Sequence, residues 1–120
     1  MKIAIVEDDP DIRSLLSMML TQKLRYPEPS LFVDGSSLVR ALTEDHKSFD
    51  VIIMDYRMPE MNGIEAAKII RRHRNETKII LTTGYDVKEE AQGAGLLYLQ
   101  KPFSMDALAR ILEQQVPASF

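Results

Sequence analysis

Residues 51–63 read Val51-Ile52-Ile53-Met54-Asp55-Tyr56-Arg57-Met58-Pro59-Glu60-Met61-Asn62-Gly63, and this stretch decides the fold. Its first four residues are apolar and rich in β-branched types, a pattern typical of a strand that is buried on both faces. The apolar run stops at Asp55, and Pro59 and Gly63 then mark a loop. Asp55 is therefore predicted to stand at the carboxyl end of a buried strand, and in an open α/β sheet that edge is where ligands bind.

The composition predicts one soluble domain spanning residues 1–120. Of the 120 residues, 45% are hydrophobic and 28% are charged, and this length supports a single core. The net charge of -3 argues against a nucleic-acid surface, which would be basic. The chain has no cysteine for disulfides or thiolate zinc sites. No apolar run approaches the roughly 20 residues that span a bilayer, and none resembles a signal peptide. We therefore expect a cytoplasmic protein without membrane or direct nucleic-acid contacts.

Strand and helix patterns alternate five times along the chain. This alternation predicts βαβ units with right-handed crossovers, and hence a doubly wound α/β domain whose parallel sheet is covered on both faces. The first helix is predicted to end near Lys23 and the second near His46, and Asp9 and Ser104 are expected as helix N-caps. The five predicted strands are residues 2–6, 30–33, 51–55, 78–81 and 96–99.

Polar side chains follow four of the five predicted strands. Glu7 and Asp8 follow the first strand, Asp55 ends the third, Thr83 follows the fourth and Lys101 follows the fifth. Because the carboxyl ends of parallel strands meet at one edge of a sheet, we expect the carboxylates, the hydroxyl and the ammonium to converge. Each residue alone has an ordinary explanation as a helix cap, a strand end or a surface charge. Their joint occurrence at successive strand ends favours a functional site.

The residue types at this edge favour magnesium and phosphoryl chemistry. Three clustered acids repel one another unless a cation lies among them, and a site with oxygen ligands and no cysteine favours Mg²⁺. A lysine and a hydroxyl supply the charge and the donor that a phosphoryl group needs. A central carboxylate can act as the nucleophile, forming an aspartyl phosphate.

With these motifs in place, the whole chain resembles the receiver domains of bacterial response regulators, the family of two-component signalling that includes the chemotaxis regulators. The resemblance implies a flavodoxin-like fold with strand order 2-1-3-4-5. It also implies a cis peptide bond between Lys101 and Pro102. The motifs that carry the resemblance are Val6-Glu7-Asp8-Asp9, Asp55 to Gly63, Thr83-Gly84-Tyr85 and Lys101-Pro102-Phe103.

The resemblance implies a role for each residue at the site. Asp55 matches the aspartate that accepts a phosphoryl group from a sensor histidine kinase or a phosphotransfer protein. Asp8 and Asp55 match direct Mg²⁺ ligands, Glu7 matches an acid that acts through water, and the backbone carbonyl of Arg57 matches the third protein ligand.

Three further residues match the family's switch. Thr83 matches the hydroxyl that moves to the phosphoryl group, Lys101 matches the cation that pairs with it, and Tyr98 matches the rotating aromatic of the output face. Thr82 is the competing hydroxyl. Strand alternation points it away from Thr83, and the small Gly84 favours Thr83 as the switch residue.

Two departures from the family pattern carry predictions. Arg57 and Tyr85 lie two residues after the acceptor and the switch hydroxyl, where bulky side chains should shield the phosphoryl group and slow its loss. The 18 residues from Thr83 to Lys101 (101 - 83) are about four fewer than the family usual, roughly one helical turn. We therefore expect a fourth helix, near residues 87–92, that is short, mobile or partly unwound.

The sequence is compatible with several interpretations of the function. The chain could be a stand-alone receiver that contacts a downstream protein, or one domain of a longer regulator whose output domain is absent from this chain. A phosphohydrolase with an aspartate nucleophile usually carries a second acid two residues later, and Arg57 in that position argues against such an enzyme. A flavin binder is disfavoured by the acidic first strand–helix turn, since a phosphate prefers hydroxyl and backbone donors there.

Overall fold

The computed structural model describes residues 1–74 and 76–115. In this part of the chain, five parallel strands form one sheet in the order β2-β1-β3-β4-β5, which confirms the predicted fold class and strand order. The short strand β2 lies at the edge of the sheet, which suits the two prolines just before it. Residues 116–120 of the predicted single domain lie outside the described residues. The strands are β1 (Ile3–Val6), β2 (Ser30–Phe32), β3 (Val51–Asp55), β4 (Lys78–Thr83) and β5 (Leu97–Gln100).

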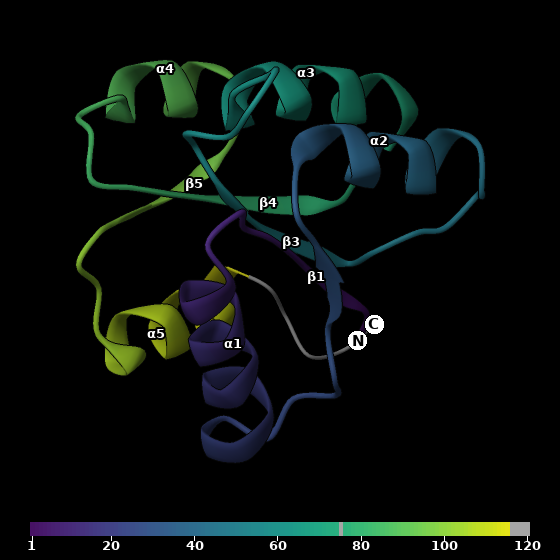
Figure 1. The fold of residues 1–120 in the computed structure, drawn as a ribbon. Coiled ribbons are helices and arrows are strands. Elements are labelled where there is room, and N and C mark those ends of the chain that lie inside the picture. Colours follow the sequence, from purple (N-terminus) through teal and green to yellow (C-terminus); the bar gives the residue numbers. More distant parts are fainter. Residues whose placement is uncertain (75, 116–120) are drawn as a thin grey trace.

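Helices cover both faces of the sheet. Figure 1 shows α2, α3 and α4 on one face and α1 and α5 on the other. The helices are α1 (Pro10–Met18), followed by a π-helical turn (Met19–Lys23), and α2 (Gly35–Thr43), α3 (Gly63–His73), α4 (Lys88–Gly93) and α5 (Met105–Gln115). None of the helices described is both long and apolar enough to cross a membrane.

Alternation along the central strands builds the two layers of the core. Ile53 and Ile80 belong to the buried cluster that contains α1 and α5 residues, whereas Met54 and Leu81 belong to the cluster that contains α2 and α3 residues. Successive side chains of a strand point to opposite faces, so both central strands are buried on both sides. The carboxyl end of β3, with Asp55, is thereby fixed at one edge of a rigid sheet.

The loop after β3 is fixed where α3 begins. The side chain of Asn62 accepts a hydrogen bond from the Glu65 backbone N–H at 2.9 Å, and the Glu65 carboxylate accepts one from the Asn62 N–H at 2.8 Å. This reciprocal capping satisfies two donors that a helix start leaves free. The Gly63 N–H donates to the Tyr56 carbonyl at 2.7 Å. Residues 56–63 are thus held directly beside Asp55.

The first two helices end differently from the sequence prediction. The segment from Pro10 reaches Lys23 as expected, but its last turn is π-helical, with the Leu24 N–H donating to the Met19 carbonyl at 2.9 Å. The second helix ends at Thr43 rather than near His46. His46 has a φ of 54°, and a left-handed residue cannot continue an α-helix.

The fourth helix is short, as predicted. It spans six residues, Lys88–Gly93, and Ala91 is its buried residue. The Leu96 N–H donates to the Ala91 carbonyl at 2.9 Å, which ties the helix end to the start of β5. The mobility of this helix stays a prediction.

Candidate functional site

Three acids meet at the carboxyl ends of β1 and β3. One carboxylate oxygen from each of Glu7, Asp8 and Asp55 lies within 4.8 Å of the other two. The pairing of β1 with β3 explains this convergence. Val6 of β1 pairs with Met54 of β3, and the next residues along the two strands are Glu7 and Asp55. Glu7 is 2% exposed and Asp55 9%, whereas Asp8 is exposed. The predicted acidic site is therefore assembled, with one member open to solvent.

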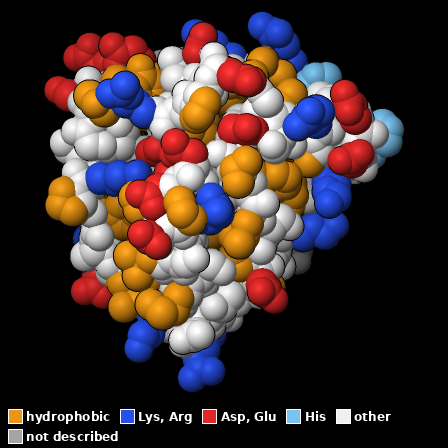
Figure 2. All heavy atoms as spheres, viewed as in Figure 1, with side chains coloured by type: hydrophobic (Ala, Val, Ile, Leu, Met, Phe, Trp, Pro, Cys, Tyr) orange, Lys and Arg blue, Asp and Glu red, His pale blue; other side chains and the backbone are white. Residues whose placement is uncertain are grey.

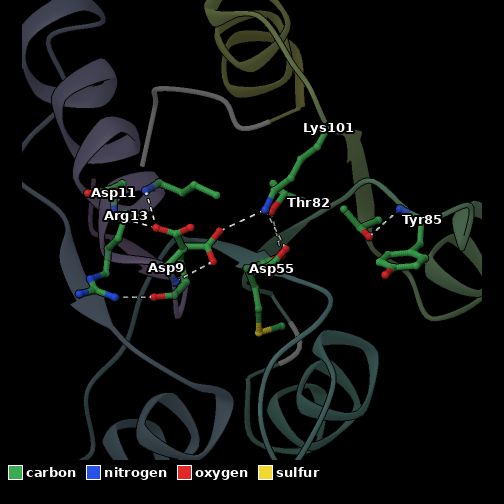
Figure 3. Close-up of polar contacts among 11 residues, drawn as sticks. Asp9, Asp11, Arg13, Asp55, Thr82, Tyr85 and Lys101 are labelled. Atoms are coloured by element: carbon green, nitrogen blue, oxygen red, sulfur yellow. Dashed lines mark hydrogen bonds and ion pairs between the residues drawn. The ribbon is translucent and has the colours of Figure 1, made fainter.

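Lys101 supplies the cation of this cluster. Its ammonium nitrogen lies 3.0 Å from Asp55 Oδ1 and 3.2 Å from Glu7 Oε1. Figure 3 shows the lysine side chain extending from the end of β5 toward Asp55. The Lys101–Pro102 peptide bond is cis, as the resemblance implied. The ammonium thus bridges two acids that come from different strands.

Burial and charge shift the pKa values of the bridged groups. Burial raises the pKa of Asp55, and the hydrogen bond and charge of Lys101 only partly offset it. Burial likewise raises the pKa of Glu7, with the charge of Asp55 adding to the effect. Burial lowers the pKa of Lys101, but its bonds to the two carboxylates outweigh burial and raise it. The positive charge of Lys101 therefore does not fully offset the cost of burying the charged forms of Glu7 and Asp55.

This charge balance suits a bound divalent cation. The cluster offers carboxylate oxygens from Glu7, Asp8 and Asp55, which are the hard ligands that Mg²⁺ takes, one or two carboxylates being usual. A cavity of about 380 Å³ adjoins the cluster and is lined by Asp8, Arg57, Met58 and Pro59. Figure 2 shows acidic side chains gathered near the middle of one face of the molecule, with basic groups beside them. The donor set and the open space fit a magnesium ion.

The two threonines at the end of β4 face opposite sides of the sheet. Thr82 pairs in register with Asp55 and follows Ile80 by two residues, so it lies on the α1/α5 face with Asp55. Thr83 lies on the other face, and its hydroxyl oxygen accepts a hydrogen bond from the Tyr85 N–H at 3.0 Å. Among the described residues, no hydrogen bond joins the Thr83 hydroxyl to Asp55 or Lys101. The structure therefore brings Thr82, rather than Thr83, to the face of the acids.

Tyr85 connects three residues that flank the site. Its N–H bonds the Thr83 hydroxyl, and its carbonyl accepts a hydrogen bond of 2.5 Å from the Tyr98 hydroxyl. Its own hydroxyl bonds the Arg57 guanidinium, whose carbon lies 5.0 Å from the centre of the Tyr85 ring. A cation over an aromatic face is attracted to it. Arg57 and Tyr85 thus form a bulky pair at the mouth of the site.

Two contacts at the site were not predicted from the sequence. The Arg13 guanidinium donates to the Glu7 carbonyl at 2.7 Å, which ties α1 to the acidic strand end. The Tyr98 hydroxyl reaches a backbone carbonyl rather than a side chain. Contacts between long side chains and distant backbone atoms follow no recognisable pattern in the sequence. By contrast, the position of Thr82 could have been found from the register of β3 and β4.

Comparison with known proteins places this geometry in a family. A family profile described as "Response regulator receiver domain" matches residues 3–113. The regulatory protein AtoC of Escherichia coli K12 is 36% identical over 117 residues, which cover 94% of this chain and 24% of AtoC. The signal transduction histidine-protein kinase BarA of the same strain is 31% identical over 125 residues, covering 99% of this chain and 13% of BarA.

A solved structure agrees with these sequence matches. The chemotaxis protein CheY4 of Vibrio cholerae superposes with a TM-score of 0.79 and 32% identity, covering 92% of this chain and 94% of CheY4. The chain spans only about a quarter of AtoC and about an eighth of BarA. Receiver domains are signalling switches that carry an acidic magnesium pocket and interact with histidine kinases or phosphotransfer proteins. The chain belongs to the response regulator receiver domains, the phospho-accepting switches of two-component signalling.

Proposed function

We propose that Asp55 is the residue of this chain that accepts the phosphoryl group. The observation that carries the proposal is the bridge from Lys101 to Asp55 Oδ1 and Glu7 Oε1, at 3.0 and 3.2 Å. It aims a fixed positive charge at the oxygen of a carboxylate that stands at the end of the buried strand β3. Charge that is fixed before the reaction stabilises the developing phosphoryl oxygens without reorganisation.

The transfer is a displacement at phosphorus. An Asp55 oxygen forms a new bond to the phosphorus of an acyl phosphate or phosphohistidine donor. The bond from phosphorus to the donor breaks, and the donor's oxygen or nitrogen leaves with the electron pair. With acetyl phosphate, an aspartyl phosphate and acetate result, and the total charge is unchanged. Lys101 exchanges its contact with Asp55 for one with a phosphoryl oxygen.

The acids would hold magnesium beside the acceptor. The side chains of Asp8 and Asp55, Glu7 through water, and the backbone carbonyl of Arg57 are the proposed ligands. Bound Mg²⁺ neutralises charge on the phosphoryl oxygens. Glu7 and Asp55 are buried and Asp8 is exposed, which supports a site that is entered from the side of Asp8.

Magnesium is expected to stabilise the fold. At a concentration about ten times its dissociation constant, Mg²⁺ should raise the free energy of unfolding by about 1.4 kcal/mol, and a chelator should reverse this. Because the folded-state pKa values of Glu7 and Asp55 are raised, the contribution of these two carboxyls to metal-free stability is greatest below the unfolded pKa values near 4 and is lost as pH rises through the folded values. Urea unfolding with and without Mg²⁺ checks this, and the benefit of Mg²⁺ should grow with pH. A benefit that is equal for wild type and an Asp8→Asn variant would contradict the ligand assignment.

Thr82, Lys101 and Tyr98 form the proposed relay, with Thr82 in the place that the resemblance gave to Thr83. The Thr82 hydroxyl lies on the face of the acids and would move to the phosphoryl group, and this movement would displace the adjacent Thr83, whose hydroxyl accepts from the Tyr85 N–H at 3.0 Å. The Tyr85 carbonyl, which holds the Tyr98 hydroxyl at 2.5 Å, is then free to shift. The contact network supports a path from the acceptor to Tyr98 and to a partner-binding face.

The phosphorylated protein is expected to lose its phosphoryl group slowly. The stacked pair of Arg57 and Tyr85 should restrict the approach of water from the mouth of the site. Arg57→Ala, which removes the pair, should accelerate hydrolysis roughly three- to tenfold. The decay of purified phosphoprotein by intact mass measures this rate. Rapid decay of the wild type, matching that of the variant, would show that the pair gives no protection.

The proposed donor is a sensor histidine kinase or a phosphotransfer protein that docks beside the site. An apolar groove of about 390 Å³ is lined by Ile12, Leu15, Leu16, Met19, Lys101, Pro102 and Phe103. The groove is continuous with the acceptor site because Lys101 belongs to both. Figure 2 shows hydrophobic side chains gathered over α1 and α5, and Leu15 is 52% exposed.

A polar residue in this groove should slow phosphoryl transfer from protein donors but not from small-molecule donors. Leu15→Gln preserves helix propensity but should slow transfer from a kinase about tenfold or more, because an apolar contact is lost. Phosphorylation by acetyl phosphate should be unchanged. Leu31→Gln, on the edge strand β2 and 49% exposed, is the matched control. Measuring transfer from a panel of purified kinases identifies the donor. Equal transfer rates to the two variants would exclude this groove as the docking site of the donor.

The chain is proposed to turn over no outside substrate. Arg57 stands where an aspartate-dependent phosphohydrolase carries its second acid, so the chain would catalyse only its own phosphorylation and dephosphorylation. The switch would act on a downstream protein or on a covalently linked output domain. We propose further that the protein is cytoplasmic and that residues 1–120 form a single domain.

Incubation with acetyl phosphate and Mg²⁺, followed by intact mass, tests the function. One phosphoryl adduct that a chelator prevents is expected, and an adduct formed equally in chelator would contradict the proposal.

A further inference from the structure

Asp8 differs from the other two acids of the cluster in how its side chain is held. Glu7 and Asp55 are buried, and both accept hydrogen bonds from Lys101. Asp8 is exposed, and among the residues that the structure describes none donates a hydrogen bond to its carboxylate. The place of this carboxylate therefore depends on the backbone that carries it, which is the turn of residues 7–9 between β1 and α1.

The side chain of Arg13 ties this turn to α1. Its guanidinium donates to the Glu7 carbonyl at 2.7 Å, and Figure 3 shows the arginine reaching from α1 past Asp9. A hydrogen bond from a charged donor is roughly twice as strong as a neutral one. Arg13 is half-buried, so water competes less for this bond than it would at an exposed site.

Arg13 bonds to the residues on both sides of Asp8. Its side chain holds the Glu7 carbonyl, and its backbone N–H donates to the Asp9 carbonyl at 2.9 Å. The Glu7 N–H donates to the Phe32 carbonyl at 3.0 Å, which fixes Glu7 to the sheet. The Glu7 carboxylate accepts from the Asp9 N–H at 3.2 Å, which closes the turn. Asp8 is thus presented to solvent by a turn whose two ends are fixed.

We propose that Arg13 is a positioning residue for magnesium, which fixes the exposed carboxylate of Asp8 by holding the backbone on either side of it. This inference rests on the proposed function, in which Asp8 is a direct magnesium ligand. Arg13 bonds to backbone carbonyls and leaves the carboxylate oxygens to the metal. Contacts that orient the ligands of a metal raise its affinity although they do not touch the ion.

A positioning role and a purely electrostatic role predict opposite effects of Arg13→Gln. The substitution removes a positive charge beside the turn that carries Glu7 and Asp8, and on electrostatic grounds alone Mg²⁺ would then bind more tightly. Loss of the fixed turn would make Mg²⁺ bind more weakly. Arg110→Gln is the matched control, because Arg110 is an exposed residue of α5 and the same charge is removed. Glutamine keeps the helix propensity at both positions.

Two measurements are made on the folded wild type and on both variants. Titration with MgCl₂, followed in ¹H–¹⁵N spectra, gives the affinity for Mg²⁺, which a loss of global stability alone would not change. The ¹⁵N order parameter of the Asp8 amide in metal-free protein reports how rigid the turn is. We expect Arg13→Gln to lower the affinity about tenfold. Its order parameter should fall from about 0.85, typical of rigid backbone, toward about 0.6. Arg110→Gln should change neither.

Two results for Arg13→Gln would overturn the inference. One is an affinity for Mg²⁺ that is equal to that of the wild type or higher, and the other is an unchanged order parameter at Asp8. A wild type that binds no Mg²⁺ would instead refute the proposed set of ligands. The order parameters of the metal-free proteins would still decide, in that case, whether Arg13 holds the turn.

Discussion

Replacing Asp55 by Asn is expected to abolish the phosphoryl adduct. The amide of asparagine lacks the anionic oxygen that attacks phosphorus, and no described residue offers another carboxylate bonded to Lys101 except Glu7, which is 2% exposed. The measurement is intact mass after incubation with acetyl phosphate and Mg²⁺. A full-strength adduct on Asp55→Asn would contradict the assignment of the acceptor.

Asp50→Asn is the matched control for this loss. Asp50 lies at the opposite end of β3, where its carboxylate accepts a hydrogen bond from the Lys2 N–H at 2.7 Å. The control removes one negative charge next to the same strand, and it should form the adduct at the wild-type rate. Because burial raises the pKa of Asp55, the Asp55→Asn protein should remain folded at neutral pH without metal. Unfolding measurements on both variants separate a lost acceptor from a lost fold.

Gly63→Ala is expected to destabilise the protein by about 3 kcal/mol, as an overpacked core position does. A Cβ at this position would lie 2.6 Å from the Asp55 carbonyl oxygen and 2.6 Å from Leu81 Cδ1. Relief of these contacts requires α3 to move away from the end of β3. The loop from Asp55 to Gly63 would move with the helix, so phosphorylation should slow together with the loss of stability.

The control for this prediction is Gly93→Ala in α4. A Cβ at Gly93 would meet no atom within 4 Å, so the substitution should be neutral or raise stability by up to about 1 kcal/mol through helix propensity. Urea unfolding of both variants measures the contrast. If Gly63→Ala were as stable as the wild type, the close packing of α3 against β3 would be wrong.

The sequence predicted the parts of the structure that depend on local pattern. The apolar run before Asp55 identified the central strand, and the polar residues after successive strands identified the edge where Glu7, Asp55 and Lys101 meet. Asp9 caps α1 as expected, accepting from the Asp11 N–H at 2.9 Å, and Ser104 caps α5, accepting from the Ala107 N–H at 3.1 Å. These features follow from periodicity and capping, which a single sequence displays.

The remaining features depend on contacts between distant segments. The π-helical end of α1 and the left-handed backbone of His46 leave no local signature in the sequence. The bond between Tyr98 and the Tyr85 carbonyl requires the closing of β5 onto β4. The place of Thr82 on the face of the acids required the register of β3 and β4, whereas the sequence showed only that Thr82 and Thr83 point apart.

The most direct test of the central claim locates the phosphoryl group itself. Borohydride reduces an aspartyl phosphate to homoserine, so the protein is treated with acetyl phosphate and Mg²⁺, reduced, digested and sequenced by tandem mass spectrometry. We predict homoserine at residue 55 and an unchanged aspartate at residue 8. Homoserine at another acid, or phosphate found on a hydroxyl with Asp55 intact, would contradict the account.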